Sequence, residues 1–342
     1  MIYFTDLLQD NKFRNFVQNY LQQKSKNTKY RFEESFPKLF HYGKLSKHLI
    51  HDIMNQKLTL SSIHCFNDVF DSTVQIYNTD EEIDKAAIKR MQEDEKLGIE
   101  IDGEYYKEFF QEESKLKFSL LDYLGTYVSC FSTLNNSTLM WSHYADSNKG
   151  ICVEYDFNYI KNNTIKSMLF PVLYTEQPLC LQELFEDGKR EITEYPLDTA
   201  VLCSVLDKSN VWEYEHEWRM IFLSGLSDKP KRREIKININ PSAVYIGNSF
   251  LKDFFEYEKP FSKPCEKITL LLELLEYIEI YNIQLYFMLP QEGSFNLKAK
   301  SINVSLVKNF IKTNFNDFRT ENIRFYYTVY KQFLTTINKN GN

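Results

Sequence analysis

Three glutamates, Glu213, Glu215 and Glu217, alternate in the segment WEYEHEWRMIF at residues 212–222. If this segment is a β-strand, alternate side chains share one face, so the three carboxylates would lie together. Their mutual repulsion would raise at least one pKa unless a cation or a substrate lay between them. Arg219 continues the same face and could supply that charge. The face is therefore either an exposed strand face or a site where carboxylates act on a substrate.

Two other segments combine polar side chains with strand or short-helix patterns. His41 lies in the strand-like KLFHYGK, where an inward-pointing imidazole needs a hydrogen-bond partner. In the short helix predicted around STLMWSHYA, Trp141 and Tyr144 are three residues apart and share an aromatic face. This face either packs in the core or stacks on a flat ring. The hydroxyls of Ser129 and Ser132, in the preceding strand, could line the same cleft.

Metal-ligand patterns are weak in this sequence. The six cysteines are dispersed, and no two of them are two to four residues apart, so a zinc framework is not expected. His48 and His51 could share a helix face, but only His64 and Cys65 follow nearby as further ligands. The cysteines and histidines therefore predict no metal site.

The composition limits the classes of protein to consider. The chain has 342 residues and a formal net charge of -6, which argues against a protein that coats nucleic acid through its global charge. The basic segment KPKRR at residues 229–233 is either a phosphate contact or a solvated hairpin tip. The chain has no run of about eighteen apolar residues and no signal-peptide pattern at its start, so a cytoplasmic protein without a membrane span is expected.

The elements that must position these residues are of mixed type. Strand patterns at 38–44, 58–63, 126–132 and 150–157 are interspersed with helical patterns of unequal length, which favours an α+β fold over a doubly wound sheet. The sequence contains no G-x-G-x-x-G, Walker or G-x-S-x-G motif. The expected organisation is an N-terminal helix at 1–30, an α+β core at 31–300 with a helical insertion at about 79–121, and a helical C-terminal extension at 301–342.

Three blocks, taken in order, carry a resemblance to a known family. They are LFHYGKLSKHLIHDIMNQKLTLSSIHCFNDVFD, CFSTLNNSTLMWSHYADSNKGICVEYD and VWEYEHEWRMI. Together they resemble the bacterial domain-of-unknown-function family 2971, whose members carry an HY pair, an NDPFD-like turn, an MWSHYAD-x-x-x-G block and an E-x-EWR block. The resemblance covers roughly residues 38–290, and Val69 stands where the family has proline.

The order of these blocks is also similar, more distantly, to the ADP-ribosyltransferase-like superfamily. That resemblance implies two small antiparallel sheets around a cleft that binds NAD. It implies an NAD-dependent transferase, with a role as a toxin or as an effector of antiviral defence that modifies nucleic acid or protein. A nucleic-acid or protein acceptor and a neighbouring regulatory protein are the partners that this reading implies.

Site roles follow from the resemblance, position by position. His41 would bind the NAD ribose on the adenosine side, and Tyr144 or Trp141 would stack on nicotinamide. Glu217 would stabilise the positive charge that develops as nicotinamide leaves, and Glu215 would orient or deprotonate the acceptor. The implied catalytic residues are Glu217, Glu215 and His41, and the implied cofactor-binding residues are His41, Tyr42, Ser132, Trp141, Tyr144 and Arg219.

Two alternatives from other classes remain open. The same cleft could bind a nucleotide or a nucleic-acid end without turning it over, as a sensor module. Alternatively, Asp68 and Asp71 of the NDVFD turn could hold a metal with the glutamates, in a nuclease or phosphotransfer enzyme. If neither applies, these two aspartates only fix a turn.

Overall fold

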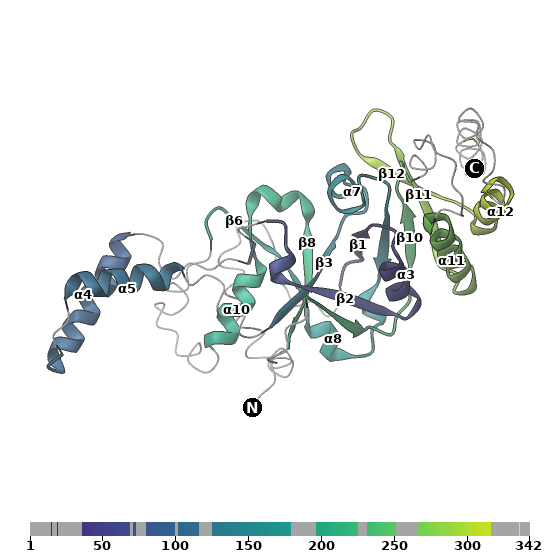
Figure 1. The fold of residues 1–342 in the computed structure, drawn as a ribbon. Helices are drawn as coiled ribbons and strands as arrows, with labels where there is room; N and C mark the ends of the chain where they lie inside the picture. Colours follow the sequence, from purple (N-terminus) through teal and green to yellow (C-terminus); the bar gives the residue numbers. More distant parts are fainter. Residues whose placement is uncertain are drawn as a thin grey trace.

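Strands from most of the described chain join one large sheet (Figure 1). The computed structural model describes residues 36–68, 71–72, 80–99, 102–115, 125–178, 196–224, 231–250 and 266–315, with the single positions 15, 19 and 335. The predicted N-terminal helix at 1–30 therefore lies outside the described residues, apart from two helical positions. Most of the predicted C-terminal extension lies outside them as well.

Over the described residues, the sheet has ten strands in the order β12-β11-β10-β4-β1-β3-β2-β9, with β8 paired to both β3 and β5. The strands are β1 (Leu39–Gly43), β2 (Lys57–Ser62), β3 (Thr126–Ser132), β4 (Ile151–Tyr155), β5 (Leu169–Pro171), β8 (Glu217–Leu223), β9 (Arg232–Lys236), β10 (Ala243–Ile246), β11 (Gln284–Pro290) and β12 (Leu297–Ser301). Among the strand pairs that the structure describes in this sheet, β10 and β11 are parallel and the others are antiparallel. Two short strands, β6 (Leu173–Thr175) and β7 (Asp207–Ser209), form a separate parallel pair.

The expectation of two small antiparallel sheets is wrong, although the mixed class of strands and helices is confirmed. The strands form a single ten-stranded sheet because β3 joins both halves. It pairs with β1 at one register position, Phe40 opposite Ser132, and with β2 at two, Ser61 opposite Val128 and Ser62 opposite Tyr127. The two halves are thus continuous, but the connection between β1 and β3 is narrow.

Helices of unequal length connect and cover the strands. They are α3 (Lys47–Met54), α4 (Asp80–Lys96), α5 (Gly103–Lys115), α7 (Thr138–Tyr144), α8 (Asn163–Ser167), α10 (Pro196–Leu206), α11 (Glu266–Ile280) and α12 (Val304–Phe315). Short 3₁₀-helices occur at η1 (Ile63–Cys65), η2 (Phe157–Tyr159) and η4 (Asn210–Glu215). The predicted helical insertion corresponds to α4 and α5, which lie together and extend away from the sheet (Figure 1).

Local signals explain where the helices nearest the site begin. Ser46 caps α3, since its hydroxyl accepts a hydrogen bond from the backbone N–H of Leu49 at 3.3 Å. Ser137 caps α7 in the same way through the N–H of Met140. Both caps satisfy backbone donors that have no partner inside the helix, so short helices can form at these points.

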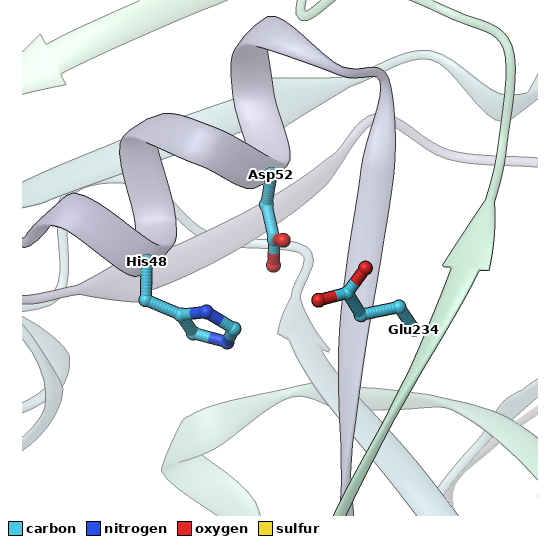
Figure 2. Close-up of side chains that lie close together, drawn as sticks. All are labelled: His48, Asp52 and Glu234. Carbon is cyan, nitrogen blue, oxygen red and sulfur yellow. The ribbon is translucent and has the colours of Figure 1, made fainter.

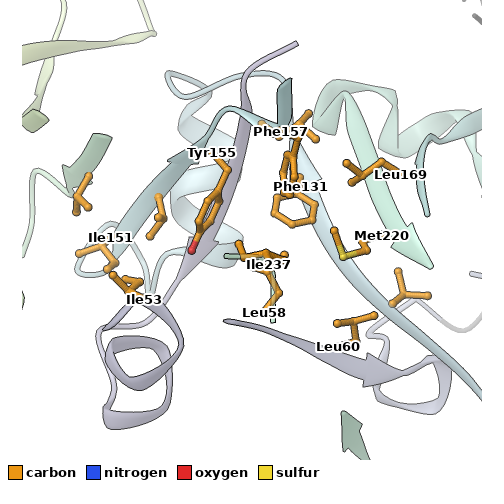
Figure 3. Packing of buried hydrophobic residues seen from close by; sticks show 14 of the residues in the cluster. Ile53, Leu58, Leu60, Phe131, Ile151, Tyr155, Phe157, Leu169, Met220 and Ile237 are labelled. Carbon is orange, nitrogen blue, oxygen red and sulfur yellow. The ribbon is translucent and has the colours of Figure 1, made fainter. Parts of the chain in front are cut away.

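The sheet packs on both faces. The main core contains residues from many elements, among them Ile53 of α3, Leu58 of β2, Phe131 of β3, Tyr155 of β4 and Met220 of β8 (Figure 3). A smaller cluster lies under α7, and it is formed by Phe40, Tyr42, Met140, Trp141, Ala145, Cys152, Ala243, Tyr245, Met288 and Leu297. Neighbouring residues of a strand point to opposite faces of the sheet. Because both faces are covered, the sequences of the central strands are nearly continuous apolar runs.

The described helices include none that is both long enough and apolar enough to cross a lipid bilayer.

Candidate functional site

A cavity lies beside β3, at the point where the neighbouring strand along one of its edges changes from β1 to β2. Along one edge, β8 pairs with β3 over its whole length, Thr126–Ser132. The other edge meets β1 at Ser132 and β2 at Tyr127 and Val128. Among the described strands, none pairs with the stretch 129–131 on this second edge, so β1 and β2 diverge around it.

The cavity at this junction has a volume of about 460 Å³, a size typical of sites for small molecules. Its walls combine aromatic and polar side chains. The aromatic side chains are Phe40, Tyr42, Phe66, Phe131 and Tyr144. The polar side chains include His41, Thr59, Ser61, Asp71, Ser129, Lys208, Glu215, Glu217 and Arg219.

Two buried cations and three buried carboxylates form a connected cluster in this cavity. Arg219 binds Asp71 through both terminal nitrogens, at 2.8 and 2.6 Å, and its Nε donates to Glu217 Oε1 at 2.8 Å. Lys208 Nζ lies 2.5 Å from Glu215 Oε2, 2.8 Å from Glu217 Oε2 and 3.8 Å from Asp71 Oδ2. All five residues are at most 6% exposed. The bidentate geometry makes Arg219 the anchor of the cluster.

The cluster is not electrically balanced. With every member ionised, three carboxylates face one guanidinium and one ammonium, which leaves a net charge of -1. In a buried site this excess attracts positive charge more strongly than it would in water. A cationic group, or one that becomes cationic during a reaction, is the complementary ligand.

The environment shifts the pKa values of the two glutamates in opposite directions. Burial opposes ionisation of Glu217, but Arg219 and Lys208 outweigh it and lower the pKa to about 2. Burial raises the pKa of Glu215, and Lys208 offsets only part of that effect. The phenol of Tyr144 donates to Glu215 Oε1 at 2.6 Å. Glu217 is thus held as a carboxylate, and Glu215 is the more basic of the two.

His41 enters the cavity with a defined tautomer. Its Nδ1 lies 2.9 Å from the backbone carbonyl of Cys130, in the stretch of β3 between β1 and β2. Because a carbonyl only accepts, Nδ1 carries the proton and Nε2 keeps its lone pair. Burial also lowers the pKa of His41, and the bond to the carbonyl opposes this only in part. At neutral pH the imidazole is uncharged, with Nε2 as an acceptor.

Two hydroxyls in the cavity wall have no hydrogen-bond partner among the described residues. These are Thr59 Oγ1 and Ser129 Oγ, and both oxygens are buried. A buried hydroxyl without a partner carries a desolvation cost of about 1–3 kcal/mol. A polar ligand in the cavity would supply the missing partners.

The alternating strand predicted for 212–222 is wrong in its first half. Residues Asn210–Glu215 form the 3₁₀-helix η4, and the strand β8 begins only at Glu217. Between them His216 adopts a left-handed backbone with φ of 45°. This turn allows Glu215 and Glu217 to reach the same ammonium, whereas Glu213 is exposed. The alternative of an exposed strand face is also wrong, because Glu217 and Arg219 are buried.

Of the predicted site residues, His41, Tyr42, Tyr144, Glu215, Glu217 and Arg219 line the cavity. Ser132 and Trp141 do not, because their polar groups bind the chain itself. The Ser132 hydroxyl donates to the backbone carbonyl of Glu215 at 2.6 Å and accepts from the N–H of Leu134. The indole N–H of Trp141 donates to the carbonyl of Asn135 at 2.7 Å, and the ring is fully buried. Both residues hold the backbone around the site.

Sequence reasoning missed Lys208 and the use made of Asp71. Lys208 sits in LDKSN, which has no recognisable motif, and reaches the glutamates through β7. Asp71 belongs to the NDVFD turn, and it binds Arg219 across 148 residues of sequence. The one signal in the sequence was that residues 213–219 contain more acidic than basic side chains. If that segment is buried, the excess carboxylates require a cation from elsewhere in the chain.

The match to a known family covers the central part of this site. Residues 140–220 match the model of the family described as "Protein of unknown function (DUF2971)". That span begins in α7 and ends in β8, and it contains Tyr144, Lys208, Glu215, Glu217 and Arg219. No match was found among curated proteins or among solved structures. The comparisons thus support the resemblance to that family, name no activity, and give no support for the ADP-ribosyltransferase-like superfamily.

Proposed function

We propose that this chain is an NAD-dependent, ADP-ribosyltransferase-like enzyme whose active site is the cavity between β1, β2 and β3. The observation that carries the proposal is the buried cluster with one excess negative charge, placed in a cavity with aromatic walls. This combination suits cleavage of the bond between nicotinamide and ribose. The bonding electrons leave with nicotinamide, and positive charge develops on the ribose carbon.

Glu217 is the proposed stabiliser of that positive charge. Its lowered pKa keeps it ionised, and Arg219 and Lys208 hold both of its oxygens at fixed positions. A carboxylate that is already oriented needs no reorganisation when charge develops nearby, which is the basis of electrostatic preorganisation. The two cations also weaken its field, and Glu215 and Asp71 restore the excess of negative charge.

Glu215 is the proposed acceptor of the proton that the attacking group loses. The acceptor nucleophile forms a bond to the ribose carbon as nicotinamide departs, and its proton must leave. Because burial raises the pKa of Glu215, this carboxylate takes up a proton more readily than Glu217 does. Overall, NAD and the acceptor give the ADP-ribosylated acceptor, nicotinamide and one proton.

The remaining wall residues fit a nucleotide with hydroxyl groups. His41 Nε2 can accept a hydrogen bond from a ribose hydroxyl, and the hydroxyls of Thr59 and Ser129 offer further polar contacts. Tyr144 is the proposed stacking partner for the nicotinamide ring, since Trp141 is enclosed outside the cavity.

A sensor module that binds a nucleotide without turning it over is the second candidate. One observation favours it: every carboxylate oxygen of Glu215 and Glu217 already has a hydrogen-bond partner. A metal-dependent mechanism at Asp71 and these glutamates is less favoured, because Lys208 and Arg219 occupy the space between the carboxylates that a metal ion would need.

The test is nicotinamide release by the purified full chain with NAD and a mixture of DNA, RNA and cell extract. Wild type is compared with Glu217→Gln and with Glu213→Gln, an exposed glutamate four residues earlier. We expect release by wild type, a loss of about 10²–10³-fold in Glu217→Gln, and less than a twofold change in the control.

Other outcomes separate the candidates. Equal release by wild type and folded Glu217→Gln would refute the role of Glu217. Stabilisation of the fold by NAD without any release would favour the sensor module. Activity that disappears in a chelator and returns with a divalent cation would favour the metal-dependent reading.

A further inference from the structure

A second cluster of ligand-type side chains lies on α3 and β9, outside the charged cluster of the cavity. Among the residues that the structure describes, His48, Asp52 and Glu234 each offer one ligand atom, and these atoms all lie within 4.8 Å of one another. His48 and Asp52 are four apart on α3, so they share one face of the helix. Figure 2 shows all three side chains pointing toward one another.

Asp52 supplies the observation that points to a ligand. This residue is only 5% exposed, and its Oδ1 is buried without a hydrogen-bond partner among the described residues. The imidazole of His51 approaches that oxygen, but at 3.8 Å it is beyond hydrogen-bond distance. A buried carboxylate oxygen is costly to leave without a partner. A cation bound between Asp52, His48 and Glu234 would supply one.

We propose that His48, Asp52 and Glu234 bind one divalent cation of the zinc type. The donor set is one imidazole nitrogen and two carboxylate oxygens, which suits zinc better than magnesium because magnesium favours oxygen ligands alone. Two atoms that bind one zinc ion at about 2.1 Å lie about 3.4 Å apart in a tetrahedral site. His48 and Glu234 are exposed, so rotation of their side chains can close the remaining distance. Three protein ligands leave the fourth position to water.

Lys57 competes with the cation for one of the ligands. Its Nζ lies 2.6 Å from Glu234 Oε2, and this hydrogen bond is the main reason that the pKa of Glu234 is lowered. Glu234 is therefore ionised and ready to bind a cation, but the ammonium must be displaced or must share the carboxylate. Removal of this ammonium should tighten cation binding.

The bound cation would join an outer strand to a helix beside the proposed active site. β9 pairs with β2, and Glu234 lies opposite Thr59, which lines the cavity. A cation held by α3 and β9 would thus stabilise this wall of the cavity. None of its three ligands belongs to the charged cluster, so cation binding can be measured separately from the proposed reaction.

The experiment is a calorimetric titration of the metal-free full chain with Zn²⁺, with Mg²⁺ titrated in parallel. We expect one Zn²⁺ per chain and no comparable binding of Mg²⁺. His48→Ala and Glu234→Gln should each weaken Zn²⁺ binding by at least about tenfold. Both change exposed side chains, so the fold should persist, which circular dichroism would check.

His64→Ala is the matched control, because this exposed histidine lies on η1 (Ile63–Cys65), outside the trio and outside helix α3. It should change the Zn²⁺ affinity less than about twofold, and Lys57→Ala should raise the affinity. No Zn²⁺ binding by wild type, or equal binding by His48→Ala, would overturn the proposal. So would a Lys57→Ala variant that binds no more tightly than wild type, since Glu234 would then not be a ligand. Nicotinamide release enters none of these outcomes, so failure here and failure of the proposed function are distinguishable.

Discussion

Replacing Arg219 with methionine is the most direct test of the buried cluster. The guanidinium donates to both oxygens of Asp71, to both oxygens of Glu217 and to the carbonyl of Val205. Without it, Lys208 alone would face three carboxylates, and the net charge of the cluster would change from -1 to -2. Removing one partner of a buried ion pair costs about 3–5 kcal/mol, and we expect a loss in that range from the free energy of unfolding.

A double-mutant cycle with Asp71 makes this prediction quantitative. Asp71→Asn alone removes one negative charge and the bidentate partner of Arg219. Combined with Arg219→Met, it returns the cluster to a net charge of -1 around Glu215, Glu217 and Lys208. The double variant should therefore be more stable than the sum of the two single losses predicts, by about 2–3 kcal/mol.

The assay is urea unfolding at pH 7, followed by circular dichroism, with all variants at one protein concentration. Lys47→Met serves as a control, because Lys47 pairs with Glu266 at 3.1 Å in a largely exposed ion pair. Lys47→Met should lower the free energy of unfolding by about 0–1 kcal/mol. Additive losses in the cycle, or a loss for Arg219→Met no larger than that of the control, would refute the account of the cluster as a coupled buried unit.

Two further predictions concern acid stability and helix capping. Because the pKa of Glu217 falls from 4.5 to about 2 on folding, its contribution of roughly 3 kcal/mol is present above pH 4.5 and is lost as the pH falls through 2. Between pH 5 and pH 3, the free energy of unfolding measured with urea should fall less for Glu217→Gln than for wild type. An equal fall in the two proteins would contradict this. Ser46→Ala removes the cap of α3 and should cost about 1 kcal/mol. A thermal midpoint equal to that of wild type would show that this cap contributes nothing.

Local patterns in the sequence were sufficient for most elements near the site. The strand predicted at 126–132 coincides with β3, and the cap predicted at Ser46 begins α3. Alternating burial, a capping hydroxyl and a charged helical pair are features that depend on neighbours within a few residues. Local patterning also suggested that the glutamates after Trp212 needed a cation if they were buried.

Only the tertiary structure decided how the site is assembled. Lys208 and Asp71 reach Arg219 and Glu217 from distant segments, and no local pattern encodes a pairing across 148 residues. The left-handed turn at His216, which replaced the predicted strand, is held by the folded surroundings rather than by its own preference. The single sheet likewise depends on three register pairs of β3. Sequence by itself determined which residues carry reactive groups and which short elements hold them. Long-range packing determined which charges meet, because burial forces each carboxylate to find a partner wherever the chain can supply one.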